Sequence, residues 1–157
     1  MKGDKIIMNY ETYDFYLAGP FFTDKQLILQ EIIEELFKSY GKKCFSPRLD
    51  AGTLPENPSK KDMLDVFNAD LEAIKHSKAL FANVSFKDTG TSVEIGYALS
   101  RNIPVILYRS PILNDTDHVN LMIALACDGK VIQSTPELME FLRTGELPNN
   151  DFQFKVE

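Results

Sequence analysis

Glu94 follows a short apolar segment at the start of a helical pattern, in the stretch from Asp88 to Leu99. The segment before it, residues 79–84, predicts a buried strand, and the helical pattern begins at Thr91. A carboxylate in the first turn of such a helix faces the carboxyl edge of the sheet, where ligands bind in open α/β sheets. The partial positive charge of a helix start favours the ionised form that a nucleophile needs. Glu94 is therefore a candidate nucleophile.

The same positions also fit a structural role for Glu94. Thr91 and Glu94 have the spacing of a capping box, in which the hydroxyl and the carboxylate bind free backbone amides at the helix start. In that alternative Glu94 stabilises the helix and takes part in no chemistry. The segment alone leaves both roles open.

Asp70 lies within a helical pattern over about residues 60–77. Apolar side chains recur on one face of this helix, with Asp70 in the middle of them: Met63, Val66, Phe67 and Ile74. Because a buried unpaired carboxylate is costly, it either finds partners or takes up a proton. Asp70 is thus a candidate acid or base. The alternative is a position at the edge of the apolar face, where the carboxylate reaches water.

Two further segments flank the expected crevice. Asp88 precedes Thr-Gly, which turn chemistry alone explains, although a carboxylate there can also accept hydrogen bonds from the hydroxyls of a sugar. Gly19, Phe21 and Phe22 follow the first expected strand, and we expect them to contact the substrate. The segment lacks the glycine pattern of a phosphate loop, whereas phenylalanines can stack on a flat heterocycle. We expect at least one of the two rings to close the core.

Strand and helix patterns alternate along the chain. Apolar runs predict five strands, over residues 13–18, 43–46, 79–84, 104–108 and 130–132. Helices are expected from Thr23 or Asp24 to Gly41, and over about 60–77, 91–101, 117–127 and 136–143. This alternation is typical of an α/β fold, a doubly wound parallel sheet with helices on both faces. Five strands favour the flavodoxin-like order 2-1-3-4-5, whose switch point lies between the first and third strands. Residues 19–22 and 85–94 should line the crevice there, and residues 47–59 predict a long loop that covers it.

Composition excludes several function classes. The 157 residues are 44% apolar, which suits one domain over residues 1–157, with 1–12 and 144–157 as tails. Acidic residues outnumber basic ones by 23 to 17 and no basic block occurs, so we expect no binding to nucleic acid or to membranes. Without a signal-type opening or an apolar run of about 18 residues, the chain is expected to be cytoplasmic. Two cysteines and two histidines in no close pair predict no metal or other cofactor.

Several separated segments together resemble the nucleoside 2-deoxyribosyltransferases. The segments lie between about Phe15 and Val131, in matching order and separation: Tyr16–Phe21, Asn68–Ile74, Asp88–Leu99 and Asn120–Met122. The resemblance implies that Glu94 attacks the anomeric carbon of a 2'-deoxynucleoside and forms a covalent deoxyribosyl-enzyme. Asp70 would protonate the departing base, and Asp88 would hold sugar hydroxyls. The substrates would be 2'-deoxynucleosides and free nucleobases.

The resemblance also implies an assembly. Asn120 and Met122 match a segment that reaches into a neighbouring subunit, so we expect a homo-oligomer, a hexamer as in the family. The chain departs from the family pattern in two respects. The family often carries a strand tyrosine that orients the nucleophile, and alignment on Ala18-Gly19 puts Phe15 there, so Tyr13, Tyr16 or Tyr97 would have to substitute. A family glutamine that contacts the base has no clear counterpart in residues 46–50.

Two alternative functions remain at this stage. A 2'-deoxynucleoside 5'-monophosphate N-glycosidase would have a similar fold and carboxylate set, but it would carry a phosphate-binding Gly-Ser-x-Arg-Gly type segment where this chain has aromatic residues. A non-catalytic nucleoside-binding module would use Glu94 as a helix cap only, since a fold alone does not define a function.

Overall fold

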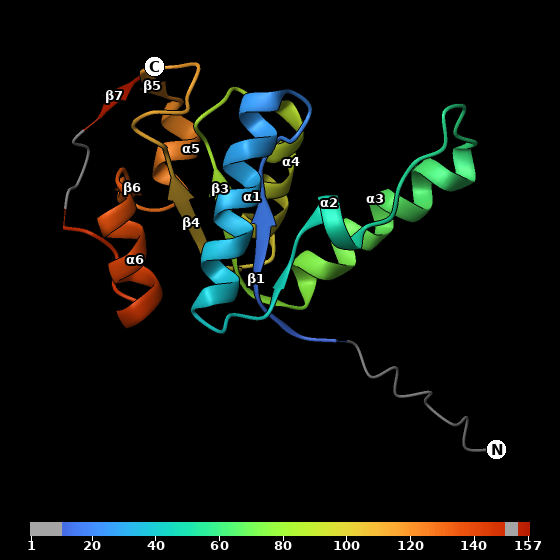
Figure 1. Cartoon of the computed structure of the whole chain (residues 1–157), viewed down its shortest axis with the longest axis horizontal. Coiled ribbons are helices and arrows are strands. Elements are labelled where there is room, and N and C mark those ends of the chain that lie inside the picture. The colour runs from blue at the N-terminus through green and yellow to red at the C-terminus, as the bar shows by residue number, and fades with distance from the viewer. Residues whose placement is uncertain (1–10, 150–153) are drawn as a thin grey trace.

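Five parallel strands form the central sheet (Figure 1). The computed structural model describes residues 11–149 and 154–157. The strands run in the order β2-β1-β3-β4-β6, and each neighbouring pair is parallel. Their bounds are Tyr13–Ala18 (β1), Cys44–Phe45 (β2), Ser77–Asn83 (β3), Val105–Tyr108 (β4) and Val131–Ile132 (β6). The expected fold and strand order are confirmed, with β6 as the fifth expected strand.

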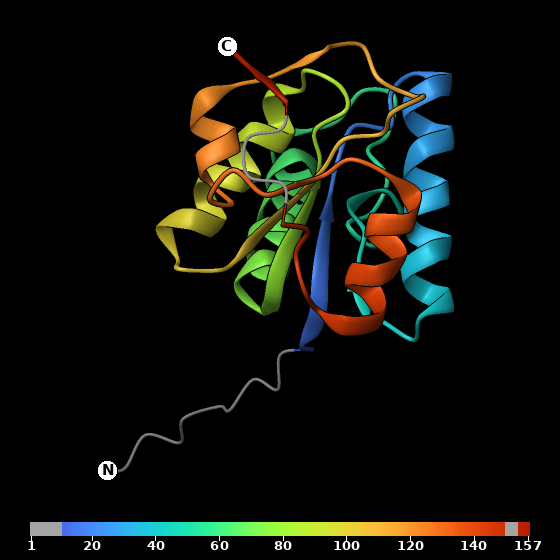
Figure 2. The ribbon, with the colours of Figure 1, turned by 90° about the vertical axis from the view of Figure 1, so that its left-hand side faces the viewer.

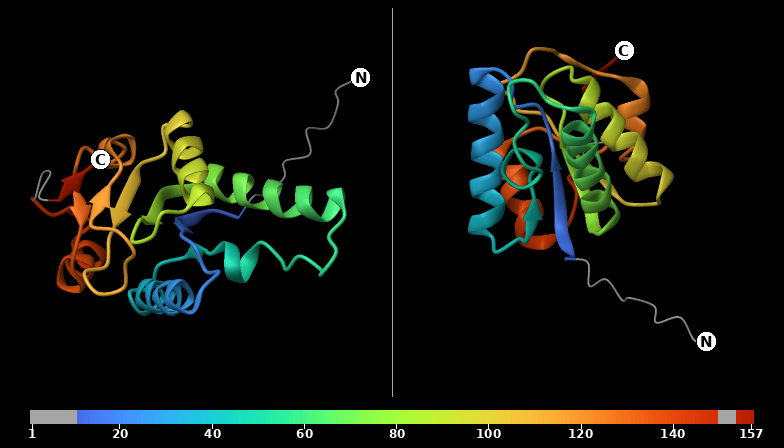
Figure 3. Two further views of the ribbon diagram at one scale, coloured as in Figure 1. Left: turned by 90° about the horizontal axis from the view of Figure 1, so that it is seen from above. Right: turned by 90° about the vertical axis from the view of Figure 1, so that its right-hand side faces the viewer.

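Helices cover both faces of the sheet (Figures 2 and 3). One face carries α1 (Asp24–Ser39) and α6 (Thr135–Thr144), and the other carries α3 (Lys60–Lys75), α4 (Thr89–Ser100) and α5 (Leu121–Leu125). A core lies on each side because successive strand residues point to opposite faces. Leu17 and Phe81 pack towards α1 and α6, whereas Tyr16 and Leu80 pack towards α3 and α4.

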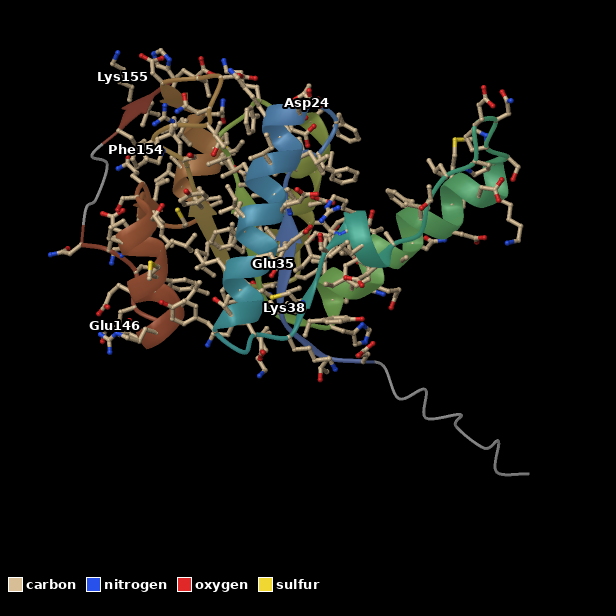
Figure 4. The ribbon with its side chains drawn as sticks, in the orientation of Figure 1. Asp24, Glu35, Lys38, Glu146, Phe154 and Lys155 are labelled. Carbon is tan, nitrogen blue, oxygen red and sulfur yellow. The ribbon has the colours of Figure 1, made fainter. Side chains whose placement is uncertain are left out.

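Helix α1 shows how the sequence specifies an element of this fold. Thr23 is its N-cap and forms a capping box with Gln26, which satisfies free amides at the helix start. The buried face of the helix carries Leu29, Ile33 and Phe37, and the solvent face carries Glu35 and Lys38 (Figure 4). The expected helix is confirmed, with Thr23 and not Asp24 as its cap.

The carboxyl ends of β1 and β3 form the switch point of the sheet. These two strands are central and pair in register from Tyr13 to Ala18 of β1, after which the chain passes to α1 on one face and, from β3, to α4 on the other. Gly19 lies at the exit of β1, where a Cβ atom would be 3.0 Å from the Asn83 Cβ and 2.6 Å from Gln30 Oε1. Only glycine fits there without displacing a buried neighbour.

The burial predicted for the apolar face of α3 is wrong for the first half of the helix. Only the carboxyl-terminal part, with Ala73 and Ile74, is buried against the sheet, whereas Met63 and Phe67 are 48% and 53% exposed. In Figures 1 and 3 the amino-terminal part of the helix extends beyond the sheet. Helical periodicity predicted which residues share a face, but the sheet is too narrow to cover the whole helix.

The helix expected over residues 117–127 is much shorter. Asn120 caps α5, and the residues before it form β5 (His118–Val119), which pairs in parallel with β7 (Lys155–Val156). The Leu121 amide donates to the Glu157 carbonyl, so the backbone here bonds to the end of the chain instead of to a helix. Of the two expected tails, residues 1–10 and 150–153 lie outside the described residues.

The segment after β2 also departs from the expected loop. Its first residues form a short helix, α2 (Pro47–Asp50), with proline at its start, where the missing amide hydrogen costs nothing. No helix within the described ranges is long and apolar enough to cross a bilayer.

Candidate active site

A cavity of about 500 Å³ opens at the switch point. Six of the eight residues singled out from the sequence line it: Gly19, Phe21, Phe22, Asp70, Asp88 and Glu94. They come from the turn after β1, from α3 and from the start of α4. The remaining wall is supplied by Val66 of α3 and by the segment after β2, including Arg48.

Asn120 and Met122 lie elsewhere in the same chain. Both line a second cavity, of about 590 Å³, which shares Asp88 and Thr91 with the first. The Asn120 side chain accepts a hydrogen bond from the Met122 amide at 2.9 Å, and the Met122 side chain is 77% exposed. Within one chain these residues therefore do not join the six that line the first cavity.

Glu94 accepts a hydrogen bond from Tyr16. The distance from the Tyr16 hydroxyl to Glu94 Oε1 is 2.6 Å. Tyr16 is fully buried in β1, and its ring stacks on Phe45 with the ring centroids 5.7 Å apart. Phe15 points to the other face and packs edge-on against Phe37, because neighbouring strand residues alternate. Of the three tyrosines considered as partners for Glu94, the structure selects Tyr16.

The capping-box alternative for Glu94 is wrong. Helix α4 begins at Thr89, so Glu94 is in the second turn, and the N-cap is Asp88. Asp88 Oδ2 accepts from the amide and the hydroxyl of Thr91, each at 2.7 Å. Asp88 is the N-cap because its carboxylate, three residues before Thr91, can accept a hydrogen bond from the free Thr91 amide. Glu94 is thereby left to face the cavity.

Burial raises the pKa of Glu94 to about 7. The hydrogen bond from Tyr16 opposes this rise, while the negative charges of Asp70 and Asp88 add to it. The expectation that the helix start favours ionised Glu94 is wrong in its cause, since Glu94 lies one turn too far along the helix and burial raises its pKa. Burial and the two neighbouring carboxylates also raise the pKa of Tyr16, which remains a donor at all ordinary pH values.

One oxygen of the Asp70 carboxyl accepts no hydrogen bond from the described residues. Its Oδ1 is buried and has no partner among residues 11–149 and 154–157. Burial raises the pKa of Asp70 to about 6, opposed by the Tyr16 hydroxyl. Asp70 and Glu94 therefore titrate as a coupled pair near neutral pH, and between their two values the pair holds about one proton. Such a pair can supply one carboxylate and one acid at the same time.

The aromatic wall is more open than expected. Phe21 and Phe22 stack with their centroids 4.9 Å apart, but Phe21 is only half-buried and Phe22 is 75% exposed. Neither ring is part of the buried core, so the expectation that at least one of them closes the core is wrong. The exposed Phe22 ring leaves an aromatic surface open to a flat ligand. In the described part of the chain, no cluster of His, Cys, Asp or Glu side chains is arranged to hold a metal ion.

The family of the chain follows from its comparison with known proteins. Residues 15–133 match the family model for nucleoside 2-deoxyribosyltransferase. The chain belongs to this family. The resemblance seen in the sequence is confirmed, and the cavity is the candidate active site of a deoxyribosyltransferase-type enzyme.

Two solved structures show how the family fold extends over the chain. The 2-deoxyribosyltransferase of the psychrotolerant bacterium Bacillus psychrosaccharolyticus is 26% identical, with a TM-score of 0.70 over 90% of this chain and 96% of that one. A conserved protein from Enterococcus faecalis V583 is 20% identical and shares the fold, with a TM-score of 0.70 over 87% and 100% of the two chains. The flavodoxin-like fold is thus confirmed. A comparison with curated proteins gives no match.

Sequence reasoning did not single out Arg48, a charged residue of the deoxyribosyltransferase cavity. Arg48 lines the cavity from α2 and is held by Glu34 of α1. A signal was present, because the segment from residue 47 was expected to cover the site. The pairing with Glu34 could not be read from the sequence, since nothing local connects α1 to α2.

We expect the pKa of Glu94 to rise by about one unit or more in Tyr16→Phe, because the lost hydrogen bond stabilises the carboxylate. The ionised fraction at neutral pH then falls. A carbon-13 NMR titration of the glutamate carboxyls measures this shift. Tyr13→Phe, which removes a surface hydroxyl bonded to Glu11, serves as the control and should leave Glu94 unchanged. A Glu94 pKa in Tyr16→Phe at or below its original value contradicts the role assigned to this bond.

Proposed function

We propose that this chain transfers a 2-deoxyribosyl group from one nucleobase to another through a covalent intermediate on Glu94. The observation that carries the proposal is the pair of coupled carboxyls, Glu94 and Asp70, at one cavity with Tyr16 bonded to Glu94. Membership of the deoxyribosyltransferase family supports the same assignment.

Glu94 acts as the nucleophile in the first half of the reaction. Its carboxylate oxygen forms a bond to the anomeric carbon while the bond from that carbon to the base nitrogen breaks. The Tyr16 hydroxyl holds the attacking carboxylate in one orientation and favours its ionised form. In the second half, the incoming base nitrogen displaces Glu94 from the same carbon, so the configuration of the donor is retained.

Asp70 transfers the proton to and from the nucleobase. In the first half it donates a proton to the departing base, and in the second half it takes a proton from the incoming one. Its raised pKa and its unpartnered buried oxygen support this role, since the acid form is available near neutral pH. Between about pH 6 and 7 the pair carries about one proton, and the two pKa values place it mainly on Glu94. The reactive state we propose is the less populated arrangement, in which that proton lies on Asp70 and Glu94 is ionised.

The other lining residues bind the substrate. Asp88 uses Oδ2 for the helix cap, which leaves Oδ1 to accept from sugar hydroxyls. Phe21 and Phe22 offer a stacking surface for the base, and Gly19 keeps the strand exit free of a side chain. The roles proposed here need no cofactor, and we place the reaction in the salvage of deoxynucleosides in the cytoplasm.

We further propose that the enzyme works as a homo-oligomer, a hexamer, in which Asn120 and Met122 complete the site of a neighbouring copy. The surface of α4 and α5 supports this, because it exposes five large apolar side chains: Val93, Leu99, Leu121, Met122 and Leu125. Exposed apolar patches of this kind mark protein interfaces. A neighbouring copy at this face would also exclude water, which favours transfer over hydrolysis.

Incubation of deoxyinosine or thymidine with a panel of free bases tests the proposed function. We expect new deoxynucleosides, separated by chromatography, and a loss of exchange of about 1,000-fold or more in Glu94→Gln. Glu72→Gln removes an exposed glutamate of α3 paired with Lys75 and should leave exchange unchanged. Exchange that persists in Glu94→Gln contradicts the proposal, as does hydrolysis confined to 5'-monophosphates, or binding of deoxynucleosides without any turnover.

Asp70→Asn should slow the enzyme most with substrates whose base needs protonation to leave. Deoxyinosine turnover should fall about 100-fold more than turnover of 7-methyldeoxyguanosine, whose base departs without added acid. Release of base under single-turnover conditions measures both rates. Asp65→Asn, an exposed acid on the same helix, should change neither. Equal slowing of the two substrates would remove Asp70 from the role of acid.

A further inference from the structure

Arg48 is the one cation among the described residues that line the candidate active site. It belongs to α2, directly after β2, and its side chain is 23% exposed. Asp70 and Glu94 of the same cavity do not hold it, because no cation contributes to the pKa shifts of these two acids. The charge of Arg48 is therefore used for something other than ionising the catalytic carboxyls.

Glu34 and Glu31 of α1 pair with part of the Arg48 guanidinium. Arg48 Nε donates to Glu34 Oε1 at 3.2 Å, and Nη2 donates to Glu34 Oε2. Glu34 is nearly buried and also accepts from the Ser46 hydroxyl at 2.6 Å, and Glu31 Oε1 lies 3.6 Å from Nη1. The side edge of the guanidinium is thus bound, which fixes its plane.

The end edge of the same guanidinium forms no hydrogen bond as a pair of donors to any residue in 11–149 or 154–157. A guanidinium has five N–H groups, and the end edge carries one from Nη1 and one from Nη2, side by side. Glu34 occupies the side edge formed by Nε and Nη2, and Glu31 is near Nη1 only. Because Arg48 lines the cavity, these two N–H groups are the donors that its side chain has left for an acceptor entering there.

The charge environment favours a neutral acceptor as the ligand of this edge. Glu34 and Glu31 offset the positive charge of Arg48, and three more carboxyls line the cavity. A phosphate dianion would meet net negative charge there. A carbonyl oxygen carries no charge and can accept both N–H groups with its two lone pairs.

We propose that Arg48 selects nucleobases that carry a carbonyl oxygen over those that carry an amino group at the same ring position. Hypoxanthine and uracil offer an acceptor to the end edge, whereas adenine and cytosine present N–H donors that meet donors. The ring nitrogens stay free for the proton of Asp70. This selectivity rests on the proposed function for its place at the base site.

Binding of free bases to the full chain tests this selectivity without requiring turnover. Calorimetric titration should show hypoxanthine bound about 10-fold or more tightly than adenine, and uracil more tightly than cytosine by a similar factor. In Arg48→Gln both preferences should disappear. Because that variant leaves Glu34 buried without its partner, the double variant Glu34→Gln/Arg48→Gln repeats the measurement with both charges removed. Arg143→Gln, which breaks a surface pair with Glu140, should retain both preferences.

The outcomes separate this inference from the proposed function. Equal affinity for the paired bases in the unaltered protein, or a preference that survives in both Arg48 variants, overturns the selectivity. Tighter binding of deoxyinosine 5'-monophosphate than of deoxyinosine, lost in Arg48→Gln, overturns it in favour of a phosphate site. An Arg48-dependent preference in a protein that exchanges no bases supports the selectivity and contradicts the proposed function.

Discussion

The hydrogen bond between Tyr16 and Glu94 joins β1 to α4, the helix that follows the neighbouring strand β3. It is the interaction that lowers the pKa of Glu94 against burial and two adjacent negative charges. Both partners must therefore be held without freedom to move apart. The parallel pairing of β1 with β3 fixes Tyr16, and the Asp88 cap fixes the start of α4. A buried glutamate without this donor would remain protonated, and a protonated carboxyl is a poor nucleophile.

The second carboxyl depends on the same arrangement. Asp70 reaches the cavity from α3, which packs beside α4 on one face of the sheet, so burial raises the pKa values of both acids while Tyr16 restrains both. The two values lie close enough for one proton to be shared, which is what acid and nucleophile roles at one site require. Arg48 of the same cavity is held by acids of α1 and contributes to the pKa of neither carboxyl.

Sequence pattern predicted the strand order, the switch point and six residues of the cavity, because alternating periodicity and parallel topology place carboxyl ends at one edge. It did not predict the pKa of Glu94. The same residues fit either a capping box or a buried carboxylate, and only the residue at which α4 begins distinguishes the two roles. It assigned Phe15, not Tyr16, to the family tyrosine position. An alignment shifted by one residue along a strand places the side chain on the opposite face of the sheet. The projecting half of α3 and the β5 and β7 pairing depend on contacts distant in sequence, which local patterns do not contain.

The central claim is that Glu94 bonds covalently to the deoxyribosyl group. Intact-mass spectrometry of the protein incubated with a 2'-fluorinated nucleoside, whose glycosyl-enzyme turns over slowly, tests it most directly. We expect a mass increase equal to one fluorinated sugar, mapped by peptide fragmentation to Glu94 and missing in Glu94→Gln. Release of the base with no adduct on the protein, or an adduct on any other residue, would contradict it.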